Sequence, residues 1–84
     1  MVQKEVTLQL ARDLDTRPVA MLVQVASRFK SDIRIEVENK RVNAKSIMGM
    51  MTLGLSSGEE VRIVAEGVDE KEALSEVEEF LTNK

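Results

Sequence analysis

The stretch DLDTRPVA, residues 13–20, places two aspartates and a threonine directly before an arginine, a proline and an apolar run. Asp15 is therefore a candidate for chemistry or for helix capping. The chain contains no histidine and no cysteine, which excludes zinc sites built on those ligands and most catalytic triads. A carboxylate just before a helix accepts backbone N–H groups and lies at the positive end of the helix dipole. We therefore interpret Asp15 as a cap, with Thr16 as the alternative, and expect no catalytic residue, metal or cofactor.

Ser46 is the second residue with usable chemistry, because it opens a short predicted helix and a helix N-cap hydroxyl is exposed. A phosphate added there would face unpaired backbone N–H groups, although from this position alone a simple N-cap is the favoured interpretation. The nine residues that follow are rich in large apolar side chains: Ile47, Met48, Met50, Met51, Leu53 and Leu55. A helix this short cannot bury them all, so we predict that some are core and others form an exposed patch for a partner.

The elements that must position these residues follow from the spacing of apolar side chains. Alternation predicts strands over 5–10, 33–37 and 61–65 and a short strand around Val42. Three- and four-residue spacing predicts helices over 18–29 and 69–81. The order is β-α-β-β-α-β-α, an α+β fold with one dry sheet face that all helices cover.

The ends of the two longer helices carry specific signals. Arg28 and Lys30 lie at the end of the first, where the helix dipole favours cations. Asp69 and Glu72 open the second at the spacing of a capping box. These residues predict where each helix ends or begins. We interpret the acidic cluster EVEEF, residues 76–80, as a solvated helix face.

The composition describes one small domain over residues 1–84. Charged residues make up 32% of the chain with a net charge of −3, and no basic block is present. Nucleic-acid binding needs a cationic stripe or exposed rings, so we expect no direct contact with nucleic acid. No apolar stretch approaches the roughly 20 residues that a bilayer requires, and no signal-peptide pattern opens the chain, so we expect no membrane segment. The absence of cysteine fits a reducing cytoplasm.

Residues 42–63, VNAKSIMGMMTLGLSSGEEVRI, resemble the signature of the HPr family, the small phosphocarriers of the bacterial sugar phosphotransferase system. The resemblance runs without gaps over essentially the whole chain and includes TRPVAMLVQVASRF at 16–29. It implies an open-faced β-sandwich, in which a four-stranded antiparallel sheet carries three helices on one face.

The chain departs from that family at the carrier position. Asp15 stands where HPr proteins have the phosphorylated histidine, and Asp13 replaces a usual glycine. Ser46 matches the regulatory serine that HPr kinase/phosphorylase modifies. The combination resembles HPr-like proteins of the catabolite-repression type, which implies a non-enzymatic regulator that binds catabolite control protein A, a LacI-type repressor, once the serine is phosphorylated. The residues that match its contact surface are Arg17, Lys45, Ser46, Ile47, Met48 and Met51.

Two alternatives stay open beside this regulatory module. Asp15 could form an acyl phosphate and act as a phosphocarrier, since aspartyl phosphates are known covalent intermediates. The negative charge of Asp15 could instead imitate phosphohistidine in a constitutive interaction protein. The regulatory type usually has an uncharged residue at this position, so the aspartate is a further departure. Monomer and dimer are both compatible with the sequence.

Overall fold

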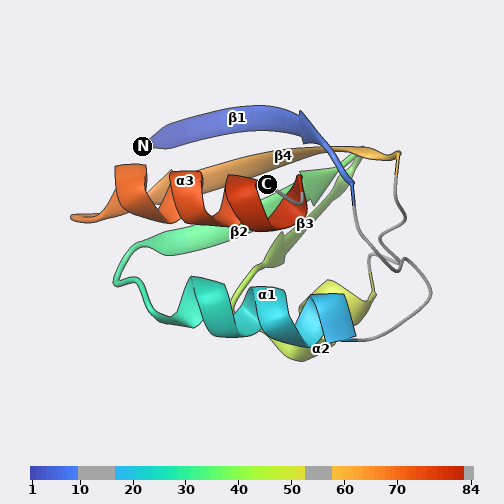
Figure 1. The fold of residues 1–84 in the computed structure, drawn as a ribbon, viewed down its shortest axis with the longest axis horizontal. Helices are drawn as coiled ribbons and strands as arrows, with labels where there is room; N and C mark the ends of the chain where they lie inside the picture. Colours follow the sequence, from blue (N-terminus) through green and yellow to red (C-terminus); the bar gives the residue numbers. More distant parts are fainter. Residues whose placement is uncertain (10–16, 53–57, 83–84) are drawn as a thin grey trace.

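The computed structural model describes residues 1–9, 17–52 and 58–82, with only the backbone described at 17–19. The described part contains four strands and three helices in the predicted order (Figure 1). Their bounds are β1 Val2–Thr7, α1 Arg17–Ser27, β2 Asp32–Val37, β3 Lys40–Asn43, α2 Ile47–Met51, β4 Glu60–Glu66 and α3 Glu70–Leu81.

The four strands form one antiparallel sheet in the order β1-β4-β2-β3. Its register sets Val6 opposite Val61, Ile35 opposite Ile63, and Val42 opposite Ile35. The helices lie on one side of this sheet, and α1 packs against both α2 and α3 (Figure 1). The predicted α+β architecture, an open-faced sandwich with three helices on one face, is confirmed.

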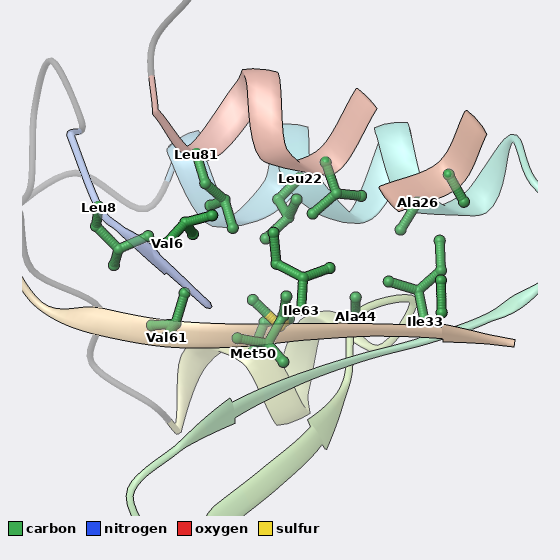
Figure 2. Packing of buried hydrophobic residues seen from close by; sticks show 14 residues of the cluster. Val6, Leu8, Leu22, Ala26, Ile33, Ala44, Met50, Val61, Ile63 and Leu81 are labelled. Carbon is green, nitrogen blue, oxygen red and sulfur yellow. The ribbon is translucent and has the colours of Figure 1, made fainter. Parts of the chain in front are cut away.

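The core lies between the sheet and the helices (Figure 2). Alternate strand residues point toward the helices because successive strand side chains face opposite ways. The buried apolar side chains are Val6, Leu8, Leu22, Ala26, Ile33, Ile35, Ala44, Met50, Val61, Ile63, Ala65, Ala73, Val77 and Leu81. Burying one large aliphatic side chain of this kind contributes about 1.5–3 kcal/mol. The predicted strand and helix faces are therefore the ones that hold the domain together.

The opposite face of the sheet is open and carries a row of alternating charges. Glu5, Arg62, Glu36 and Arg41 lie side by side across the four strands. Arg62 contacts the carboxylates of Glu5 at 3.1 Å and Glu36 at 3.6 Å. Opposite charges on neighbouring strands contribute roughly 0.2–1 kcal/mol per pair. Val64, which lies on this open face by strand alternation, is nevertheless only 3% exposed.

The prediction that cations occupy the end of the first helix is wrong. Helix α1 ends at Ser27, so Arg28 and Lys30 follow it. The backbone N–H groups of Arg28 and Phe29 donate to carbonyls three residues earlier, each at 3.2 Å, which tightens the chain after the helix. The backbone N–H of Lys30 then donates to the carboxylate of Asp69 at 2.9 Å. This long-range bond ties the segment after α1 to the residue before α3.

The predicted capping box at the start of α3 is also wrong. Asp69 is the residue before α3, but its side chain makes no capping bond to that helix. The carboxylate instead accepts from the backbone N–H of Lys30, and from the N–H and hydroxyl of Ser31 at 2.9 and 2.5 Å. Glu70, not Glu72, reaches back and accepts from the backbone N–H of Gly67 at 3.1 Å.

The Asp69 carboxylate is held in its charged form by these donors. Its pKa is lowered from 3.8 to about 2, first by the Ser31 hydroxyl and then by the Lys30 N–H. Hydrogen bonds to a carboxylate favour its ionised state, which is the physical cause of this pKa. Gly67 makes the close approach possible, because a Cβ on it would lie 2.6 Å from Cα of buried Ser31.

A two-residue turn, Glu38 and Asn39, joins β2 to β3 and sets Val37 opposite Lys40. Glu38 has a φ of 54°, in the left-handed region that residues with a Cβ rarely adopt. The first residue of this turn therefore carries backbone strain.

Candidate functional site

Ser46 is the N-cap of α2, as the sequence predicts. Its backbone is extended, with φ −108° and ψ 113°, and its Oγ accepts from the backbone N–H of Gly49 at 3.2 Å. Its carbonyl accepts from the N–H of Met50 at 2.9 Å. A β-region residue whose side-chain oxygen takes a helix N–H is the usual capping geometry. The hydroxyl therefore lies at the mouth of the helix.

The turn that leads into Ser46 is fixed by four hydrogen bonds. Ser46 N–H donates to the carbonyl of Asn43 at 3.0 Å, and Lys45 N–H donates to Oδ1 of Asn43 at 2.8 Å. Buried Ala44 donates its N–H to the carbonyl of Ile33 at 2.8 Å, which ties the turn to β2. The ammonium of Lys45 donates to the carbonyl of Phe29 at 2.7 Å, beyond the end of α1. The position of Ser46 is therefore set by three separate parts of the fold.

The apolar side chains after Ser46 divide between core and surface, as predicted. Met50 is fully buried, whereas Met48 is 78% exposed, Met51 53% and Ile47 46%. Met51 lies close to both Ile47 and Met48 on the surface of α2, because residues three and four positions apart are neighbours on a helix. We call Ile47, Met48 and Met51 the α2 patch. Leu53 and Leu55 lie outside the described residues.

Two predicted site residues, Asp15 and Arg17, lie outside or at the edge of the described part of the chain. Asp15 lies outside the described residues, so its predicted role as a cap or as a phosphate carrier stays a prediction. Arg17 is the first residue of α1, and only its backbone is described. Because α1 packs against α2, the start of the chain's first helix and the Ser46 turn belong to the same helical layer.

The described geometry offers a hydroxyl for modification rather than an activated nucleophile. The Oγ of Ser46 is engaged by a backbone N–H, and the ammonium of neighbouring Lys45 by a backbone carbonyl. Among residues 1–9, 17–52 and 58–82, no three or more carboxylates are placed to hold a metal ion. The helices in these ranges are all too short or too polar to span a bilayer.

Sequence reasoning missed the Asp69 contact with Lys30 and Ser31. These residues are 38 and 39 positions from Asp69. The only signal in the sequence was an aspartate just before a helix, and that pattern indicates a local cap rather than a distant partner. The contact matters for the site because Lys30 adjoins Phe29, the residue whose carbonyl receives Lys45.

The chain matches known proteins over nearly its full length. A family described as the PTS HPr component phosphorylation site covers residues 2–83. The HPr-like protein Crh of Bacillus subtilis (strain 168) is 48% identical over 81 residues, which are 96% of this chain and 95% of that protein. The similarity to HPr-like proteins of the catabolite-repression type, predicted from residues 42–63 and the missing histidine, is thus confirmed at the level of sequence identity.

Solved structures agree with this assignment. The phosphocarrier protein HPr from Bacillus anthracis str. Ames superposes with a TM-score of 0.92 at 46% identity, covering 96% of each chain. The crystal structure of selenomethionine-labelled Crh from Bacillus subtilis, described as a swapped-domain dimer, gives a TM-score of 0.76 at 48% identity, covering 96% of this chain and 93% of that one. The family match, the sequence identities and the superposed structures agree, and the chain belongs to the HPr family.

Proposed function

We propose that this protein is a regulatory HPr-like protein of carbon catabolite repression. HPr kinase/phosphorylase phosphorylates Ser46, and the modified protein then acts in the cytoplasm as a corepressor of catabolite control protein A. The observation that carries the proposal is the placement of the capping hydroxyl of Ser46 at the start of α2, beside the exposed α2 patch. The 48% sequence identity to the HPr-like protein Crh of Bacillus subtilis supports the same proposal.

Proteins of the HPr family are phosphocarriers and regulators rather than enzymes. The phosphocarrier role needs an imidazole, and this chain contains no histidine at any position. Asp15, at the carrier position, would have to form an acyl phosphate in its place. The regulatory role needs only the serine and the surface around it, and both are present.

One phosphate can create an interface here through two physical contributions. The phosphate adds about −1.5 to −2 charges and accepts charge-assisted hydrogen bonds from arginine or lysine of the partner. The α2 patch adds apolar burial, since a methionine taken fully out of water contributes about 1.5–3 kcal/mol. Association itself costs at least several kcal/mol, about 4 or more. Neither contribution is large enough alone, so binding should depend on the phosphorylated state.

Mass spectrometry after incubation with HPr kinase and ATP tests the first step. We expect one phosphate, located on Ser46 by fragmentation. Calorimetric titration into catabolite control protein A should then show binding by the modified protein only. Ser46→Ala should abolish both results, with Ser75→Ala, an exposed serine of α3, as the matched control.

Ser46→Ala also removes a helix cap, at a cost of about 0.5–2 kcal/mol. Circular dichroism of the variant should therefore show a folded protein with a modestly lower melting temperature. Equal repressor binding by modified and unmodified parent would remove Ser46 as the switch.

A further inference from the structure

One peptide unit lies between two side chains of opposite charge. The carbonyl of Phe29 accepts from the ammonium of Lys45 at 2.7 Å. The N–H of Lys30, in the same peptide group, donates to Oδ2 of Asp69 at 2.9 Å. The peptide thus carries a cation on its oxygen and an anion on its N–H.

These two bonds strengthen one another. An ammonium at the oxygen draws electron density toward that oxygen, which makes the N–H of the same group a better donor. A carboxylate at the N–H acts in the same sense from the other side. Linked hydrogen bonds polarise each other in this way, and bonds to charged groups are the stronger ones. Lys45 and Asp69 are therefore coupled through a single peptide group.

We call the chain of contacts from Lys45 through the Phe29–Lys30 peptide to Asp69 the bridge. It ends at Lys45, the residue next to Ser46. The backbone N–H of Lys45 is held by Asn43, while its side chain extends to the carbonyl of Phe29, two residues beyond the end of α1. The Lys45 ammonium is part-buried at this contact, so it is engaged inside the protein.

We propose that Lys45 is a positioning residue, which holds the Ser46 turn against the Phe29–Lys30 peptide and so couples it to Asp69 at the start of α3. For the role of Ser46 this inference rests on the proposed function. It assigns Lys45 an internal contact in addition to its predicted place on the partner surface.

The first experiment uses the unmodified protein, so it is independent of any phosphorylation. Lys45→Met keeps the aliphatic stem and removes the charge, and Lys40→Met, at an exposed lysine of β3, is the matched control. In Lys45→Met the amide proton of Lys30 should move upfield and exchange with solvent about 1.3- to 4-fold faster. This is the size expected when its charge-assisted bond to Asp69 loses the roughly 10–30% that a linked bond adds.

The amide of Ser31 serves as an internal reference. It donates to the same carboxylate, but it belongs to the next peptide group. General loosening of the protein would shift both amides equally, whereas loss of the bridge shifts Lys30 more. Unchanged or equal shifts of the two amides would overturn the proposal.

The second experiment measures kcat/KM for phosphorylation of Ser46 by HPr kinase. Lys45→Met and Asp69→Asn should both lower it, and the double variant should be no slower than the slower single variant, because both changes break one bridge. A loss in Lys45→Met without any in Asp69→Asn would mean that Lys45 touches the kinase directly, which overturns the positioning role. If the parent protein is not phosphorylated at all, the proposed function fails, while the amide measurement still decides whether the bridge exists.

Discussion

Met48 and Met50 lie two residues apart on α2 and should respond in opposite ways to the same substitution. Met48 is 78% exposed, and Met50 is fully buried. If a partner covers Met48, the burial still available to it is about 1.2–2.3 kcal/mol, taking about 1.5–3 kcal/mol for a whole side chain. Alanine keeps only the Cβ, so Met48→Ala should lose about 1–2 kcal/mol of binding, a factor of about 5–30 in Kd.

The stability of the two variants should show the reverse order. Met48→Ala changes an exposed position, where substitutions usually stay within about 0.5 kcal/mol. Met50→Ala leaves a cavity in the core and should cost about 2–5 kcal/mol. For a domain of this size, that lowers the melting temperature by about 8 °C or more.

The assay pairs calorimetric titration of the Ser46-phosphorylated proteins into catabolite control protein A with thermal unfolding of the same samples. We expect Met48→Ala to weaken binding without lowering the melting temperature, and Met50→Ala to lower the melting temperature. Parent-like binding by Met48→Ala would refute the reasoning, because the most exposed methionine of the α2 patch would then lie outside the interface.

Three further predictions concern stability and phosphate chemistry. Because folding lowers the pKa of Asp69 from 3.8 to about 2, its contribution to the free energy of unfolding is present above pH 3.8 and is lost as the pH falls toward 2. Urea titrations across this range should show that the free energy of unfolding falls less steeply with decreasing pH in Asp69→Asn than in the parent protein. Gly67→Ala should destabilise by about 1–3 kcal/mol, since its Cβ would lie 2.6 Å from Ser31 Cα. Gly58→Ala, which also has positive φ but no atom within 4 Å, separates backbone strain from this clash in the same unfolding assay. Enzyme I and phosphoenolpyruvate should leave the protein unphosphorylated, and a hydroxylamine-sensitive phosphate on Asp15 would contradict this.

Features set by neighbouring residues could be predicted from the sequence. Ser46 caps α2 because the serine and the Gly49 N–H that it accepts are three residues apart, so residue type and spacing carry the information. The strand faces around Ile33, Ile35 and Ile63 follow likewise from alternation. The division of α2 between Met50 and the exposed patch was foreseen only in part, because helical spacing does not say which side faces the core.

Features set by distant residues could not be predicted. The carboxylate of Asp69 has the right type and position for a local cap, yet Lys30 and Ser31 lie within reach only after the chain has folded. The same holds for Lys45, whose ammonium meets a carbonyl 16 residues earlier in the chain. A propensity rule compares a residue with its neighbours, whereas tertiary contacts override such preferences.

The turn at Glu38 bears on how this protein can evolve. A residue with a Cβ in the left-handed region costs roughly 1–2 kcal/mol, and asparagine tolerates that conformation better than glutamate does. Natural selection removes only changes that bring a protein below the stability its function needs, so a small cost at an exposed turn can persist. One substitution, Glu38→Asn, is thus available to raise the free energy of unfolding without changing any residue of the α2 patch. A lineage that acquired it could accept more destabilising substitutions in the α2 patch and so alter this surface without losing the fold.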